Sequence, residues 1–174
     1  MHKIIQAIAF AAEKHRGQRR KDRDASPYIN HPIALANVLA NEAGIEDESV
    51  LVAAVLHDTI EDTDTSEEEM AHLFGRAVVG IVNEVTDDKS LPKAERKRLQ
   101  IERASQAGRE AKLVKLADKI CNLRDLAGSP PADWSFERKQ EYLRWAKAVV
   151  DQIRGVHPTL ERLFDEAYRL GLLP

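Results

Sequence analysis

The segment HDTIEDTD at residues 57–64 places one histidine and four carboxylates directly after the apolar run VLVAAVL. On a helix His57 would share a face with Glu61, because residues four apart lie above one another. Carboxylates crowded together raise one another's pKa values. A divalent cation removes that conflict, and histidine and aspartate are ordinary ligands for one. The segment alone also allows a solvated helix end, although acids there oppose the helix dipole.

Two other segments could supply further ligands. His31 in YINHP stands at the start of an expected helix, where its ring can project into the centre of a bundle. Taken alone, His31 fits a capping or core histidine equally. Asp118 lies in KLADKICNLRDL, a segment otherwise rich in apolar residues. A buried carboxylate needs a partner, which would be either a metal ion or a lysine or arginine.

Together these residues form the pattern H…HD…D, with spacings of about 26 and 60 residues. This pattern resembles the HD superfamily of metal-dependent phosphohydrolases. HRGQRRKD, PYINHP, AAVLHDTIEDTD, EVTDDKSLPKAERK and AKLVKLADKICNLRDL occur in that order between about residues 3 and 170. They are similar to the hydrolase domain of the RelA/SpoT alarmone enzymes, especially the stand-alone small hydrolases also found in animals. The resemblance implies four metal ligands: His31, His57, Asp58 and Asp118.

The same resemblance implies a reaction, hydrolysis of (p)ppGpp at its 3′-diphosphate to give GDP or GTP and pyrophosphate. Family members typically use Mn²⁺, and a His/carboxylate set also suits Fe²⁺ or Zn²⁺. Glu61 and Asp62 match the catalytic acids of the family, with their roles undivided. Two alternatives stay open: an NADPH 2′-phosphatase or other HD nucleotide phosphohydrolase, and a non-catalytic alarmone-binding module. Retention of the full ligand set disfavours the non-catalytic alternative.

A very anionic substrate needs cations, and a basic cluster precedes His31. Without context, a solvated basic face is the favoured explanation of such a cluster. Tyr28 could stack on the base or pack inside the bundle. By resemblance, and from the basic segments after residue 92 and on the expected eighth helix, we assign substrate binding to Arg20, Lys21, Tyr28, Lys93, Asn122, Arg138 and Tyr142.

Helices must position these groups, because apolar residues recur at helical spacing and no segment alternates with period two. We expect an all-α fold, a single compact HD-type bundle of about eight to ten helices over residues 1–174. The first helix is expected to bury Ile4, Ile5, Ile8, Ala9 and Ala12. The first four expected helices cover residues 2–16, His31-Pro32 to Gly44, Asp47 to about Glu61, and a segment from the Thr65–Glu68 capping box to Gly75. The next five cover residues 77–86, a segment that begins at Pro92, residues 110–126, Ser135 to about Ile153, and a segment that begins at His157-Pro158.

Composition excludes several other classes. The 174 residues carry a net charge of −3 and one short basic cluster, which makes nucleic-acid binding a poor interpretation. The single Cys121 allows no intramolecular disulfide and, as an expected packed thiol, is compatible with a reducing cytoplasm. No apolar stretch approaches the roughly 20 residues that span a bilayer. His15, His72 and His157 are expected at the surface or as helix caps. The oligomeric state stays open.

Overall fold

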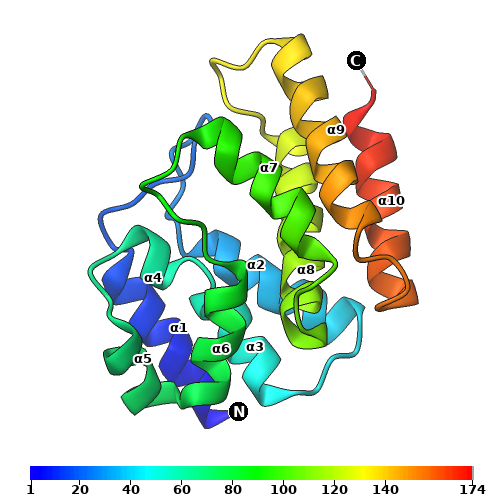
Figure 1. Ribbon diagram of the computed structural model, residues 1–174. Coiled ribbons are helices and arrows are strands. Elements are labelled where there is room, and N and C mark those ends of the chain that lie inside the picture. The colour runs from blue at the N-terminus through cyan, green and yellow to red at the C-terminus, as the bar shows by residue number, and fades with distance from the viewer. Residues whose placement is uncertain (174) are drawn as a thin grey trace.

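The computed structural model describes residues 1–173, and within that range the chain is all-helical, as the sequence predicts (Figure 1). Arg19 and Pro27 form one isolated β-bridge in the loop after the first helix. No helix within the described range is both long and apolar enough to cross a membrane. The elements are α1 (His2–Lys14), α2 (Asn30–Asn37), η1 (Val38–Glu42), α3 (Glu48–Leu56), α4 (Thr59–Asp62), α5 (Glu67–Phe74), α6 (Arg76–Val85), α7 (Lys93–Ala104), α8 (Arg109–Gly128), α9 (Phe136–Asp151) and α10 (Pro158–Gly171).

Two helices form the centre of the bundle. In α3 every residue from Val50 to Leu56 is buried, and α8 buries residues around most of its circumference. Helix α3 packs against α1, α2 and α6, while α8 packs against α2, α6, α9 and α10 (Figure 1). Because close-packed helices deform little, side chains at the end of α3 and in the middle of α8 have rigid supports.

The helix expected from Asp47 to Glu61 is interrupted at His57 and Asp58. Helix α3 ends at Leu56, and the short α4 begins at Thr59. The break has a local cause, because the His57 ring bonds to the carbonyl of Ala54, which a continuous helix would pair with residue 58. Asp58 takes φ −102° and ψ 0°, outside the helical region. The expected sharing of one helix face by His57 and Glu61 is therefore wrong.

Two smaller corrections concern a cap and a buried face. Ser66, not Thr65, caps α5, since its hydroxyl accepts the amide of Glu69 at 3.1 Å. In α1 the fully buried positions are Ala7 and Ala11, whereas Ile5 is 59% exposed. The buried face of α1 thus differs from the expected one. It consists of positions that lie three and four residues apart and face α3. Asp47, Ser135 and His157, where the sequence predicts that helices begin, are the N-caps of α3, α9 and α10.

Candidate metal centre

Three separate helices bring the candidate ligands together. His31 lies in the first turn of α2, His57 follows the last residue of α3, and Asp118 lies midway along α8. One ligand atom from each of these residues lies within 4.8 Å of the others. Asp58 adjoins the group, with its Oδ2 atom 2.9 Å from Nε2 of His57. All four residues predicted as ligands from the sequence therefore lie in one cluster.

The two imidazole rings are oriented for ligation. Nδ1 of His57 lies 2.9 Å from the carbonyl oxygen of Ala54, so this nitrogen must donate and Nε2 is the nitrogen that can give up its proton to ligate a metal. Nε2 of His57 lies 2.9 Å from Oδ2 of Asp58, and Nε2 of His31 lies 3.2 Å from Oδ1 of Asp118. Within residues 1–173, Nδ1 of His31 is buried without a hydrogen-bond partner. Buried polar atoms normally have partners. A nitrogen lone pair directed at neighbouring carboxylates fits a bound cation, so the residues present are suited to a divalent metal.

The electrostatics of the cluster favour the same ion. Burial lowers the pKa of His31. Burial acts in that direction on His57 as well, but the negative charge of Asp58 outweighs it and raises the pKa of His57 to about 9. Burial likewise opposes ionisation of Asp58, yet the charge of His57 holds the pKa of that carboxyl below its usual range. A cation bound here would replace the proton that His57 otherwise keeps.

Outer contacts hold the two carboxylates in place. Asp118 accepts hydrogen bonds from Nδ2 of Asn122 at 2.7 Å and from Nζ of Lys119 at 2.8 Å. The hydroxyl of Tyr28 donates to Oδ2 of Asp58. Partners of this kind orient metal ligands and tune their basicity. Tyr28 and Asn122, which the sequence analysis assigns to substrate binding, thus also support the cluster.

Glu61 and Asp62 take different positions. Glu61 lines the cavity of about 200 Å³ that contains the candidate ligands. It accepts the amide of Asp87 at 2.9 Å, and burial raises its pKa to about 7, with help from nearby carboxylates. Asp62 is not among the residues that line this cavity, and it forms an ion pair with Lys89.

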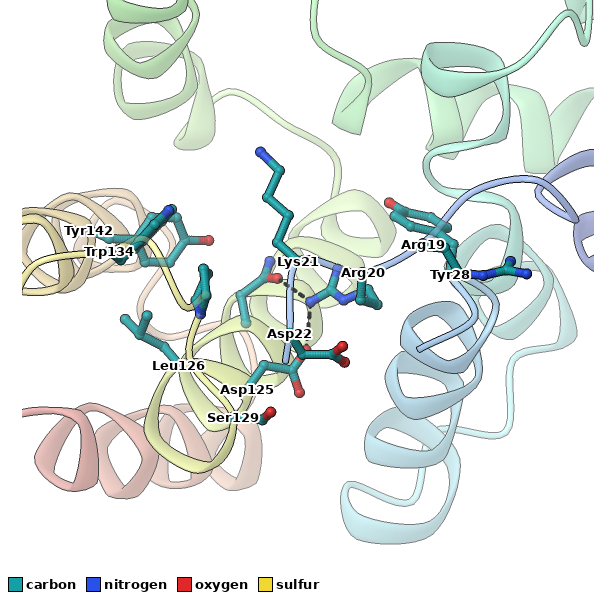
Figure 2. A pocket seen from close by; sticks show the side chains of 12 residues that line it. Arg19, Arg20, Lys21, Asp22, Tyr28, Asp125, Leu126, Ser129, Trp134 and Tyr142 are labelled. Carbon is teal, nitrogen blue, oxygen red and sulfur yellow. Dashed lines mark hydrogen bonds and ion pairs between the residues drawn. The ribbon is translucent and has the colours of Figure 1, made fainter. Parts of the chain in front are cut away.

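A second cavity of about 260 Å³ adjoins the first, and both are lined by Arg20, Tyr28 and Asn122. Figure 2 shows Trp134 and Tyr142 on one side of this second cavity and Tyr28 on the other. Arg20 lies between them and bonds to Asp125 at 2.5 Å and to Asn122 at 3.3 Å. A chain of contacts therefore runs from the basic loop through Asn122 to Asp118.

Most of the residues assigned to substrate binding line this second cavity. Lys93 and Arg138 are exposed and line neither of the two cavities. Burial lowers the pKa of Lys97, and the positive charges of Lys93 and Arg138 nearby lower it further. Lys97 in turn lies 5.7 Å from the ring of Tyr142, so the three cations form a basic group beside that aromatic residue. The assigned residues that line the second cavity are Arg20, Lys21, Tyr28, Asn122 and Tyr142.

The structure also reveals site residues that the sequence did not single out. Trp134 lines the second cavity. The cavity that contains the candidate ligands (the metal cavity) is also lined by Asp87, Gln100, Lys115 and Lys119. The two lysines could have been identified from the sequence, because they are charged residues inside the otherwise apolar run KLVKLADKI. His15, expected at the surface or as a cap, is the C-cap residue of α1, and it is also 2% exposed and packs against the ring of Tyr28. Cys121 is a buried free thiol, as expected.

Comparison with known proteins places this geometry in a family. A family model described as an HD domain matches residues 7–144. The guanosine-3′,5′-bis(diphosphate) 3′-pyrophosphohydrolase MESH1 of Xenopus tropicalis is 55% identical over 165 residues, which cover 95% of this chain and 92% of that protein. The protein of the same name from Drosophila melanogaster is 54% identical over 172 residues, with coverages of 98% and 96%.

A solved structure agrees with these matches. It is described as a metazoan orthologue of SpoT that hydrolyses ppGpp, and it superposes with a TM-score of 0.94 at 53% identity. The match covers 99% of this chain and 98% of the other. The chain therefore belongs to the HD-domain family and, within it, to the RelA/SpoT group that includes the stand-alone metazoan hydrolases.

Proposed function

We propose that this protein is a (p)ppGpp 3′-pyrophosphohydrolase, which converts the alarmone to GDP or GTP and pyrophosphate. One observation carries the proposal. The cavity that holds the His31, His57 and Asp118 cluster opens, through Arg20, Tyr28 and Asn122, into a cavity with aromatic and basic walls. That pairing matches a substrate with a purine at one end and a diphosphate ester at the other. The named activity of relatives that share almost the whole chain supports it.

His31, His57, Asp58 and Asp118 would hold one divalent cation. Two neutral imidazoles and two carboxylates suit Mn²⁺, and they suit Fe²⁺ and Zn²⁺ as well. When bound, such an ion lowers the pKa of a coordinated water and polarises a phosphate oxygen. The protein's own contribution is to aim Nε2 of His57 at the ion through the bond from Nδ1 to Ala54, and to hold Asp58 in position with the hydroxyl of Tyr28.

Glu61 is the residue best suited to move a proton. It faces the candidate ligands across the cavity, and its pKa of about 7 is matched to neutral conditions. In the reaction the oxygen of water bonds to the phosphorus nearest the ribose, and the bond from that phosphorus to the 3′ oxygen breaks. Glu61 would accept a proton from the water. The departing 3′ oxygen takes a proton in turn, which completes the hydrolysis.

Asp62 would act on the same water or leaving oxygen only after a rearrangement, because Lys89 now pairs with its carboxylate. Lys89 lies in the loop before α7 and is half-exposed. An anionic substrate that attracts Lys89 would release Asp62 to the reaction. We therefore assign the primary proton transfer to Glu61 and a supporting role to Asp62.

The nucleoside would occupy the cavity of Figure 2. Trp134, Tyr142 and Tyr28 supply flat apolar surfaces for a purine, while Arg20 and Lys21 supply positive charge for phosphate oxygens. Lys93 and Arg138 would add long-range attraction from the rim around Lys97. The oxygens of Asp125 now hold Arg20 in place, so the guanidinium is pre-positioned before substrate arrives.

The experiment that tests this function is a direct comparison of substrates. Purified protein supplied with Mn²⁺ is incubated separately with ppGpp, pppGpp, NADPH and deoxynucleoside triphosphates, and initial rates are measured. We expect the two alarmones to be turned over with the highest kcat/KM. Preferred release of phosphate from NADPH would instead identify a 2′-phosphatase. Tight ppGpp binding without turnover and without bound metal would identify a regulatory module.

A further inference from the structure

A third cavity, of about 290 Å³, meets the metal cavity on another side. The two cavities share Asp87, Gln100 and Lys115, whereas the third cavity shares no lining residue with the nucleoside cavity of Figure 2. The metal cavity therefore lies between two others. A substrate held by its purine on one side would extend its reacting diphosphate toward the other.

Lys115 lies at the junction of the metal cavity and the third cavity. It is on α8, one turn before Asp118, and is 8% exposed. Among residues 1–173 its ammonium makes no ion pair and no hydrogen bond with a side chain or a carbonyl. Its neighbour Lys119, by contrast, pairs with Asp118 at 2.8 Å. The Lys115 side chain is buried but lines both cavities, so an anion that enters them would supply the partner that its ammonium lacks.

Arg96 is a second cation beside the third cavity whose hydrogen-bonding groups are not all paired. It lines the third cavity, its Nε atom is buried without a partner, and its Nη1 atom lies 4.0 Å from Glu61. The acids nearby are already occupied by neutral donors. Asp87 accepts from Gln100 at 2.7 Å, and Glu84 accepts the amide of Gly108 at 2.5 Å. Glu84, Asp87 and Asp88 keep their negative charges, which Arg96, Arg103 and Lys115 balance in the lining of this cavity. The donors that remain for an anionic ligand are the Nε group of Arg96 and the ammonium of Lys115.

We propose that Lys115 and Arg96 form a binding subsite for the diphosphate that becomes the product pyrophosphate. The inference rests on the proposed function, because it places the two ends of that substrate on opposite sides of the metal cavity. Lys115 would contact the oxygens of the reacting diphosphate, and Arg96 those of its terminal phosphate. After the bond to the 3′ oxygen breaks, pyrophosphate remains on this side and the nucleotide on the other, so the two products separate.

The test measures binding of inorganic pyrophosphate and of GDP separately, by thermal-shift titration at a fixed free Mn²⁺ concentration. Replacing Lys115 with methionine keeps the length of the side chain and removes its charge. We expect K115M to bind pyrophosphate about 10- to 100-fold more weakly, the effect of losing a charged hydrogen bond, with GDP affinity unchanged. K112M, on the same helix but outside these cavities, is the matched control and should bind both as the wild type does.

A second pair of variants gives the reciprocal result. K21M changes the nucleoside cavity, and we expect it to weaken GDP and leave pyrophosphate unchanged, while R96Q should weaken pyrophosphate. Unchanged pyrophosphate affinity in both K115M and R96Q would overturn the subsite.

The folding behaviour of K115M separates a binding role from a structural one. Removal of an unpartnered buried charge should leave the melting temperature equal or raise it. A K115M protein that melts far below the wild type would also overturn the proposal, because Lys115 would then be a structural residue. These titrations require no turnover. An inactive wild type that still binds pyrophosphate through Lys115 would refute the proposed function and leave the anion site standing.

Discussion

His57 donates a hydrogen bond from Nδ1 to the carbonyl oxygen of Ala54, three residues earlier, at 2.9 Å. This one contact fixes which nitrogen of the ring faces the backbone, ends α3, and directs Nε2 into the cavity where His31 and Asp118 converge. The same residue that breaks the helix is thereby placed as a candidate ligand. Helix geometry and metal chemistry are thus coupled at a single side chain.

The first prediction concerns the ligands themselves. Changing His57 or Asp118 to alanine should weaken metal binding by more than about 100-fold, since loss of an outer-shell partner alone costs about 10- to 100-fold. Metal content per chain, measured by elemental analysis after dialysis, should fall together with activity. The exposed His72 provides the control, and H72A should retain both. An H57A protein with full metal content would remove His57 from the ligand set.

Tyr28 offers a test of support from outside the ligand set. The Y28F variant loses the hydroxyl that donates to Asp58 but keeps the aromatic ring that lines the nucleoside cavity. We expect metal affinity to fall by about 10- to 100-fold, as for other outer-shell partners, while KM at saturating Mn²⁺ stays nearly unchanged. A change in KM alone would show instead that the hydroxyl contacts substrate.

The pH dependence of the rate tests Glu61. Burial raises the pKa of Glu61 to about 7, and a nearby cation lowers it from there because it favours the carboxylate. A base works only when deprotonated, so kcat/KM of the metal-loaded enzyme should level off above about pH 7 and decline at a lower pH, as Glu61 becomes protonated. The E61Q variant should keep its metal and lose about 100-fold to 10,000-fold in kcat. Its remaining kcat/KM should no longer decline at low pH. A rate that instead declines above pH 7 would make Glu61 the acid.

The sequence predicted the ligands better than the geometry that holds them. The spacing of His31, His57, Asp58 and Asp118, read with the family resemblance, identified four residues that three helices bring together. The helix break at His57 escaped prediction because the apolar and polar pattern continues through it. Its cause is a side-chain bond to the backbone, which hydrophobic periodicity does not encode.

Other differences between the predicted and the observed structure arise where two residues fit a capping pattern equally well, or where packing between helices decides which side chains are buried. Thr65 and Ser66 each stand three residues before a glutamate, so the capping pattern fits both, and only the structure shows that Ser66 is used. Lys112, Lys115 and Lys119 recur at helical spacing, which is typical of a solvated stripe. Burial of the last two depends on neighbouring helices that a single segment does not reveal.

The most direct test of the account is to identify the products formed from ppGpp in ¹⁸O-labelled water with Mn²⁺ present. We predict GDP and intact pyrophosphate in equal amounts, with the label in pyrophosphate, because water attacks phosphorus and the bond to the 3′ oxygen breaks. Release of orthophosphate, label in GDP, or no consumption of ppGpp by metal-loaded protein would contradict it.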